Sequence, residues 1–77
     1  MIKPGTTVKF VKMPDWVSKL PQRSRKVFQF CLGRTYQVDE IDENGLCVLD
    51  VSADVDPRFG GYLNDIHLEP EFLLEVQ

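Results

Sequence analysis

Histidine and cysteine are the side chains of this chain that could carry catalysis or bind a metal, and there are few of them. The sequence holds one histidine, His67, and two cysteines, Cys31 and Cys47. A general base needs a hydrogen-bonded partner, and a nucleophilic cysteine needs a base beside it, but no motif around these residues supplies either. Their spacing also differs from the close Cys/His pairs of structural zinc sites. We therefore expect no catalytic residue, no metal site and no cofactor.

Two aspartates, Asp54 and Asp56, alternate in the way that oxygen-rich calcium loops do. The other ligands of the twelve-residue calcium pattern are missing, and Pro57 follows directly. We therefore expect these carboxylates to be solvated turn residues that accept hydrogen bonds from their own backbone.

The cysteines also bear on the cellular compartment. Each lies among apolar neighbours, at 30–32 and 46–48, where cysteine behaves as a small buried hydrophobe. Two cysteines are too few for a disulfide scaffold, so we predict two reduced thiols in the core. No apolar run approaches the roughly 20 residues that cross a bilayer, and the N-terminus shows no signal-peptide pattern. A cytoplasmic protein without membrane contact is expected.

Charge is distributed unevenly along the chain. The net charge is −3, but residues 1–38 carry +7 and residues 39–77 carry −10. Such asymmetry can mark an interaction face. It can also be neutralised where the two halves lie side by side, and this second arrangement is the one we favour, because a small domain keeps its charges close together.

The basic half holds the strongest candidate binding surface. Residues 16–34 contain five Lys and Arg side chains and no acid, and aromatic side chains accompany them. We predict a non-catalytic interaction module that binds a protein partner, one with an acidic surface, as a monomer or weak homo-oligomer. The predicted partner-binding residues are Trp16, Lys19, Arg23, Arg25, Lys26, Arg34, Tyr36, Phe59 and Tyr62.

Nucleic acid is the alternative partner for the same residues. Basic side chains can follow a phosphate backbone while aromatic rings stack on bases. Against this, the chain has a pI of ≈ 4.9, whereas nucleic-acid-binding domains usually exceed about 9. Weak binding of nucleic acid therefore stays the second hypothesis.

The elements that would position these side chains are mostly strands. Alternation of Val8 and Phe10 with polar neighbours predicts a strand over 6–13. Asn44-Gly45 predicts a tight hairpin, because both residues tolerate positive φ. Further strands are predicted over 35–41, 46–51, 62–68 and 72–76, with a turn of 3₁₀ helix at 69–71.

One segment shows helical spacing. Val27, Phe28, Cys31 and Leu32 would share one face of a short helix over 24–32, with Ser24 capping its start and Gly33 its end. Residues 14–23 and 52–61 contain prolines and glycines and are predicted as loops. The predicted core consists of Val8, Phe10, Phe28, Leu32, Tyr36, Val38, Val48, Leu49, Ile66, Leu68 and Leu74.

Five short strands, a long first loop and a tight central hairpin are typical of a small closed barrel. The opening residues 4–10, the segment from Leu20-Pro21 to Val38 with Gly33-Arg34-Thr35 before the second strand, and the tail 68–76 resemble SH3-like barrels. The middle segment is similar to nitrile hydratase β-subunit barrels and to small uncharacterised bacterial proteins. The resemblance implies an all-β fold, in which residues 1–77 form one five-stranded SH3-like barrel with a short helix between the first two strands. It implies no enzymatic activity, because that barrel is an accessory part of nitrile hydratase.

Overall fold

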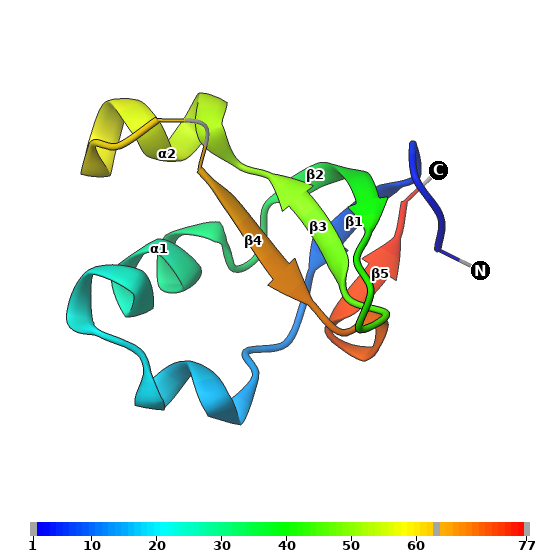
Figure 1. The fold of residues 1–77 in the computed structure, drawn as a ribbon, viewed down its shortest axis with the longest axis horizontal. Coiled ribbons are helices and arrows are strands. Elements are labelled where there is room, and N and C mark those ends of the chain that lie inside the picture. Colours follow the sequence, from blue (N-terminus) through cyan, green and yellow to red (C-terminus); the bar gives the residue numbers. More distant parts are fainter. Residues whose placement is uncertain (1, 63, 77) are drawn as a thin grey trace.

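The computed structural model describes residues 2–62 and 64–76. Five strands form one antiparallel sheet in the order β4-β3-β2-β1-β5 (Figure 1). The strands are β1 (Thr7–Phe10), β2 (Thr35–Ile41), β3 (Cys47–Asp50), β4 (Asp65–Leu68) and β5 (Leu73–Glu75). The helices are η1 (Asp15–Lys19) and η2 (Pro70–Phe72), both 3₁₀, and the α-helices α1 (Gln22–Cys31) and α2 (Ser52–Phe59).

The five predicted strands are all present, and the predicted 3₁₀ turn before the last strand is confirmed. Strand β2 has the bounds predicted for it, whereas the others are shorter than expected. In the last part of the chain, Leu63 of the predicted strand over 62–68 lies outside the described residues. The hairpin between β2 and β3 is confirmed, and Asp42 holds its turn by accepting hydrogen bonds from the amides of Asn44 and Leu46, both at 2.9 Å.

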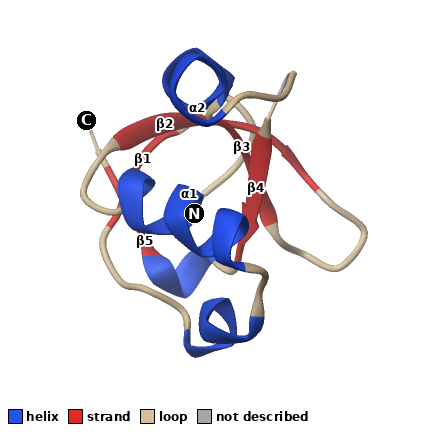
Figure 2. Cartoon of the chain, turned by 90° about the vertical axis from the view of Figure 1, so that its left-hand side faces the viewer, coloured by secondary structure: helices blue, strands red, loops and turns tan. Residues whose placement is uncertain are grey.

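The sheet is strongly curved but is not closed into a barrel. Strand β2 pairs with β1 on one side and with β3 on the other. Its register against β3 shifts between Val38 and Glu40, where a bulge bends the strand. Figure 2 shows the strands curving around α1, with β4 and β5 on opposite sides. The predicted five-stranded, β-rich architecture is confirmed. The predicted closed barrel is wrong, because β4 and β5 do not pair in the described part of the chain and are the two open edges of the sheet.

Helix α1 follows β1 and precedes β2 in the chain, as predicted, but it begins at Gln22, two residues before the predicted start. Its N-cap is Pro21, and no side chain caps the helix start, so Ser24 does not have the predicted capping role. Gly33 does end the helix: it has φ 87°, and its amide donates to the Phe10 carbonyl at 2.7 Å. Of the predicted apolar face, Phe28 and Cys31 are buried, whereas Leu32 is 40% exposed.

Helix α2 replaces the loop that was predicted after β3, so that prediction is wrong. Val51 and Val55 are four residues apart and both are 0% exposed, which anchors the first turn in the core. The Asp50 carboxylate accepts hydrogen bonds from the Ser52 amide and hydroxyl, at 3.0 and 2.6 Å, and supports the helix start. Pro57 lies inside the helix and has no N–H, so α2 lacks one i→i−4 hydrogen bond there.

The core lies between the curved sheet and the two α-helices. Leu74 was expected inside but is 58% exposed, whereas Leu73 is buried opposite Phe10. The reason is that η2 runs through Phe72, which shifts the inward positions of β5 by one residue. The predicted core residues confirmed as buried are Val8, Phe10, Phe28, Tyr36, Val38, Val48, Leu49, Ile66 and Leu68, and the buried cysteines Cys31 and Cys47 are free thiols.

Tyr36 is a buried residue whose hydroxyl makes no well-formed hydrogen bond. The hydroxyl lies near the Cys31 thiol and the Asp54 carboxylate, and burial raises the pKa of Tyr36 well above its usual range. An unsatisfied buried hydroxyl destabilises the fold, so we expect Tyr36→Phe to raise the free energy of unfolding by about 1 kcal/mol. Urea denaturation measures this change. A loss of stability in Tyr36→Phe would show instead that the hydroxyl makes a useful bond to Cys31 or Asp54.

Candidate binding groove

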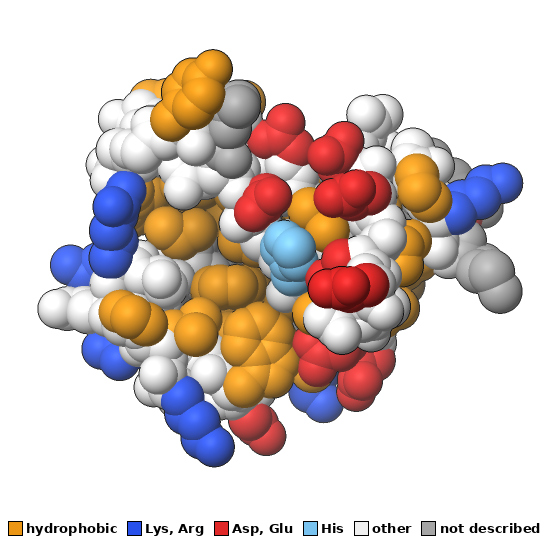
Figure 3. Space-filling view, in the orientation of Figure 1, with side chains coloured by type: hydrophobic (Ala, Val, Ile, Leu, Met, Phe, Trp, Pro, Cys, Tyr) orange, Lys and Arg blue, Asp and Glu red, His pale blue; other side chains and the backbone are white. Residues whose placement is uncertain are grey.

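Two adjoining cavities form one groove between the helical segment 15–31 and the edge strand β4. Their volumes are ≈ 280 and ≈ 570 Å³, and both are lined by Phe28, Asp65 and Ile66. We call this feature the α1–β4 groove. Its floor consists of Trp16, Leu20, Phe28 and Ile66, and its rim carries Arg23, Asp65, His67 and Glu69. Figure 3 shows an apolar band at this place, with Lys and Arg on one side and Asp and Glu on the other.

Edge-on aromatic contacts connect the floor of the groove to the core. The Trp16 ring of η1 meets the Phe28 ring of α1 edge-on at 5.6 Å, and Phe28 meets Phe10 of β1 in the same manner at 6.4 Å. The Trp16 indole N–H donates to the Glu69 carboxylate, 3.2 Å from each oxygen. Because Trp16 is only partly buried, the one tryptophan of the chain offers part of its ring to the groove.

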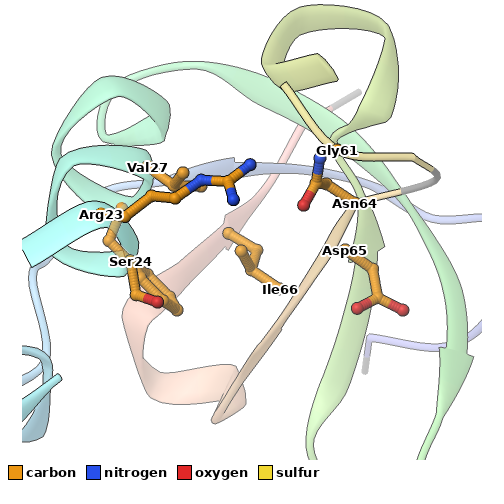
Figure 4. Close-up of a pocket in the computed structure, with 8 residues that line it drawn as sticks. Arg23, Ser24, Val27, Gly61, Asn64, Asp65 and Ile66 are labelled. Carbon is orange, nitrogen blue, oxygen red and sulfur yellow. The ribbon is translucent and has the colours of Figure 1, made fainter. Parts of the chain in front are cut away.

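Arg23 closes one end of the groove. It reaches from α1 toward Gly61 and Asn64, above Ile66 in the view of Figure 4, and its guanidinium donates to the Phe59 and Gly60 carbonyls, both at 2.9 Å. A Cβ at Gly61, which has φ +96°, would lie 2.9 Å from the Asn64 side chain and 3.2 Å from Arg23. Glycine at position 61 therefore permits this close approach.

His67 lies at the other end of the groove, among carboxylates. Its Nδ1 is 2.8 Å from Asp42 Oδ2, and its Nε2 is 3.7 Å from Asp65 Oδ1. A histidine held by a carboxylate could act as a base, but nucleophilic catalysis also needs a nucleophile beside it. Both cysteines are 0% exposed, and the side-chain partners of the His67 ring nitrogens among the described residues are the carboxylates of Asp42 and Asp65. His67 and Asp42 therefore contribute to the charge of the groove rim.

The stability of the domain at low pH depends on the ionisation of the Asp42 carboxylate. The backbone amide of Leu46, and then His67, hold the pKa of Asp42 below its ordinary value. Because the folded-state pKa is lowered, this stabilisation is present above about pH 4 and is lost as the pH falls through the folded-state pKa. We expect Asp42→Asn to flatten the acid limb of the stability profile, measured by urea denaturation at several pH values. An unchanged acid limb would contradict this role.

Of the predicted partner-binding residues, Trp16 and Arg23 line the groove. Tyr36 is buried, so its side chain is absent from the surface where we expected it. Tyr62 is 84% exposed and follows Gly61 at the rim. Phe59 lies outside the groove, where its ring meets Phe30 edge-on at 5.7 Å.

The remaining basic residues lie outside the groove. The Arg25 guanidinium donates to the Leu20 carbonyl at 2.8 Å, and Arg34 donates to the Phe30 carbonyl at 3.1 Å while stacking on the Phe30 ring at 4.0 Å. Lys19 and Lys26 are exposed on η1 and α1. The structure thus assigns the three arginines Arg23, Arg25 and Arg34 a role in bracing the chain, which their spacing could not reveal.

The sequence did not lead us to predict the wall of the groove that β4 forms. Asp65, Ile66 and His67 line the groove, and Glu69 follows them, far from Trp16 along the chain. The alternation Asp65-Ile66-His67-Leu68 gave the only signal, since it places Asp65 and His67 on the solvent face of a strand. Which residues lie across the groove from that strand is decided by the topology.

Within residues 2–62 and 64–76, no group of three or more His, Cys, Asp or Glu side chains is placed to hold a metal ion. Among the helices of the described chain, none has the length and apolar character needed to cross a membrane. Comparisons of the chain with protein-family models, with curated proteins and with solved structures found no match.

Proposed function

We propose that this chain is a non-catalytic protein-binding module and that the α1–β4 groove is its binding site. The observation that carries the proposal is the apolar floor, which lies open between a helix and an unpaired strand edge and is anchored by a partly exposed tryptophan. Aromatic anchors in apolar depressions dominate the energetics of protein interfaces. Charge of opposite sign on the two sides of the groove would orient the bound partner.

A protein partner fits these side chains better than nucleic acid does. Arg23, Arg25 and Arg34 already donate to backbone carbonyls, so Lys19 and Lys26 are the least engaged of the five basic residues predicted to bind a partner. The rim on the β4 side is acidic, with Asp65 and Glu69, and would repel a phosphate backbone. The lysines would instead face an acidic part of the partner surface.

We also propose that the fold is SH3-like. Support comes from the strand order β4-β3-β2-β1-β5, the tight β2–β3 hairpin and the 3₁₀ turn between β4 and β5. In this proposal α1 occupies the long first loop and stands over the open side of the sheet. Small barrels serve many unrelated roles, so the function is argued from the groove and not from the fold.

The test uses Trp16 as its own reporter, because a ligand in the groove changes the surroundings of the single indole. The probes are short peptides with one apolar anchor flanked by basic, acidic or neutral residues, and DNA and RNA oligonucleotides. Fluorescence titration is expected to show saturable binding of the peptides with basic flanks, because a peptide in the groove lies against the acidic rim formed by Asp65 and Glu69. The expected Kd is in the micromolar to millimolar range, about −8 to −4 kcal/mol.

Two results would overturn the proposal. One is the absence of saturable binding by every peptide. The other is saturable binding of oligonucleotides that weakens steeply as salt rises, because that dependence indicates neutralised phosphates. The second result would support the nucleic-acid hypothesis in its place.

A further inference from the structure

We propose, building on the proposed function, that the groove binds an extended segment of a partner protein as an additional strand on the edge of β4. The segment would alternate apolar side chains with lysine or arginine. Three observations carry this inference: the direction of the free peptide groups of β4, the two faces that an added strand would meet, and the charge on the outer face.

The peptide groups of Asp65 and His67 point away from the sheet. The Val51 amide donates to the Asn64 carbonyl at 3.2 Å, at the end of the β3–β4 ladder. In an antiparallel ladder bonded pairs alternate, so Leu49↔Ile66 and Cys47↔Leu68 are the bonded pairs that follow. The intervening residues Asp65 and His67 therefore direct their N–H and C=O groups to the open edge.

The β2–β3 ladder gives the same result independently. The Asp42 amide donates to the Leu46 carbonyl at 2.9 Å, so Val48 forms the next bonded pair with Glu40 of β2. The neighbouring residues of β3 must then bond to β4, which is the pattern deduced above. Both ladders thus leave the same two residues of β4 unpaired along the groove.

An added strand would present its side chains alternately to two different surfaces. Its inward side chains would share the face of Ile66 and meet the apolar floor around Trp16 and Phe28. Its outward side chains would share the face of Asp65 and His67. The apolar floor therefore selects for an apolar residue at every second position of the segment.

The outer face selects for positive charge. Asp42 lies 2.8 Å from His67, Asp65 lies 3.7 Å from it, and Figure 3 shows further carboxylates gathered around the histidine. Lysine or arginine opposite these residues would form favourable cross-strand pairs. Two copies of this chain joined through β4 would instead bring Asp65 and its acidic neighbours together, which disfavours self-pairing.

The experiment removes backbone N–H donors from a peptide without changing its side chains. The probe is the peptide acetyl-Lys-Val-Lys-Val-Lys-Val-Lys-amide, with two derivatives that carry backbone N-methyl groups on all lysines or on all valines. In an added strand only one of these sets donates to β4, the lysine set where the strand runs antiparallel. We expect that set to weaken binding at least about tenfold and the other set to bind as the parent peptide does.

A second measurement locates the pairing on the protein. In the complex, the amides of Asp65 and His67 should exchange with solvent at least about tenfold more slowly than in the free domain. Asp65→Lys should weaken binding of the parent peptide, whereas Asp39→Lys, an equal charge change two strands away on β2, should have much less effect.

The outcomes separate the inference from the function on which it rests. Equal tolerance of both N-methylated peptides, or unchanged exchange at Asp65 and His67, would overturn strand addition while leaving the groove as a binding site. A domain that forms dimers through β4 and excludes the peptide would also overturn it. Absence of binding by every peptide would overturn the proposed function itself.

Discussion

Leu49→Ala is expected to lower the free energy of unfolding by about 2–5 kcal/mol. Leu49 is 0% exposed, and its strand β3 lies between β2 and β4, where it pairs with Val38 and Ile66. Removing its side chain leaves a cavity in a core that has little reserve, since small domains have only about 5–15 kcal/mol of stability in total. Urea denaturation followed by circular dichroism measures the loss.

Leu74→Ala provides the matched control, because it makes the same chemical change at a site that is 58% exposed. Its effect should stay within about 0.5 kcal/mol, as is usual for surface substitutions. If the two variants lost equal stability, the central position of β3 and the outward position of Leu74 would both be wrong.

Trp16→Ala is expected to have the largest effect on binding. The indole supplies much of the apolar floor, and truncation of a tryptophan at the centre of an interface typically costs at least about 2 kcal/mol, or roughly thirtyfold in Kd. Isothermal titration calorimetry with the alternating Lys-Val peptide measures the change, since the variant has lost its fluorescent reporter.

Two controls separate a binding effect from an effect on folding. Trp16→Phe keeps an aromatic ring on Phe28 but removes the hydrogen bond to Glu69, and should weaken binding only a few-fold. Phe59→Ala removes another half-buried ring that lies outside the groove, and should leave Kd unchanged. Unchanged affinity in a folded Trp16→Ala variant would contradict the assignment of the site.

Local sequence signals predicted the strands better than they predicted the helices. The Asn-Gly hairpin, the alternation of Val8 with Phe10 and the apolar run of β3 each depend on neighbouring residues, and each is confirmed. Helix α2 was missed because Pro57 and the following glycines suggested a loop. What stabilises that helix is the burial of Val51 and Val55. Their spacing of four residues was a local helical signal, but it was weaker than the signal of the proline and glycines.

The candidate site was predicted only on one of its two walls. Trp16 and Arg23 stood out through residue type and charge, and both line the groove. The opposite wall, with Ile66 and Glu69, is brought there by the order of the strands, which no local pattern specifies. Two incompatible predictions were made for Tyr36, one that it lies in the core and one that it binds a partner at the surface. The alternation of its strand favours the first, which is confirmed.

The most direct test of the central claim is an amide NMR titration of the domain with the alternating Lys-Val peptide, followed by one with DNA and RNA oligonucleotides. We expect the peptide to shift amides along β4 and around Trp16, Leu20 and Phe28, and the oligonucleotides to leave those amides unchanged. Shifts confined to the lysine-bearing surface of η1 and α1, or caused by the oligonucleotides alone, would contradict the α1–β4 groove as a protein-binding site.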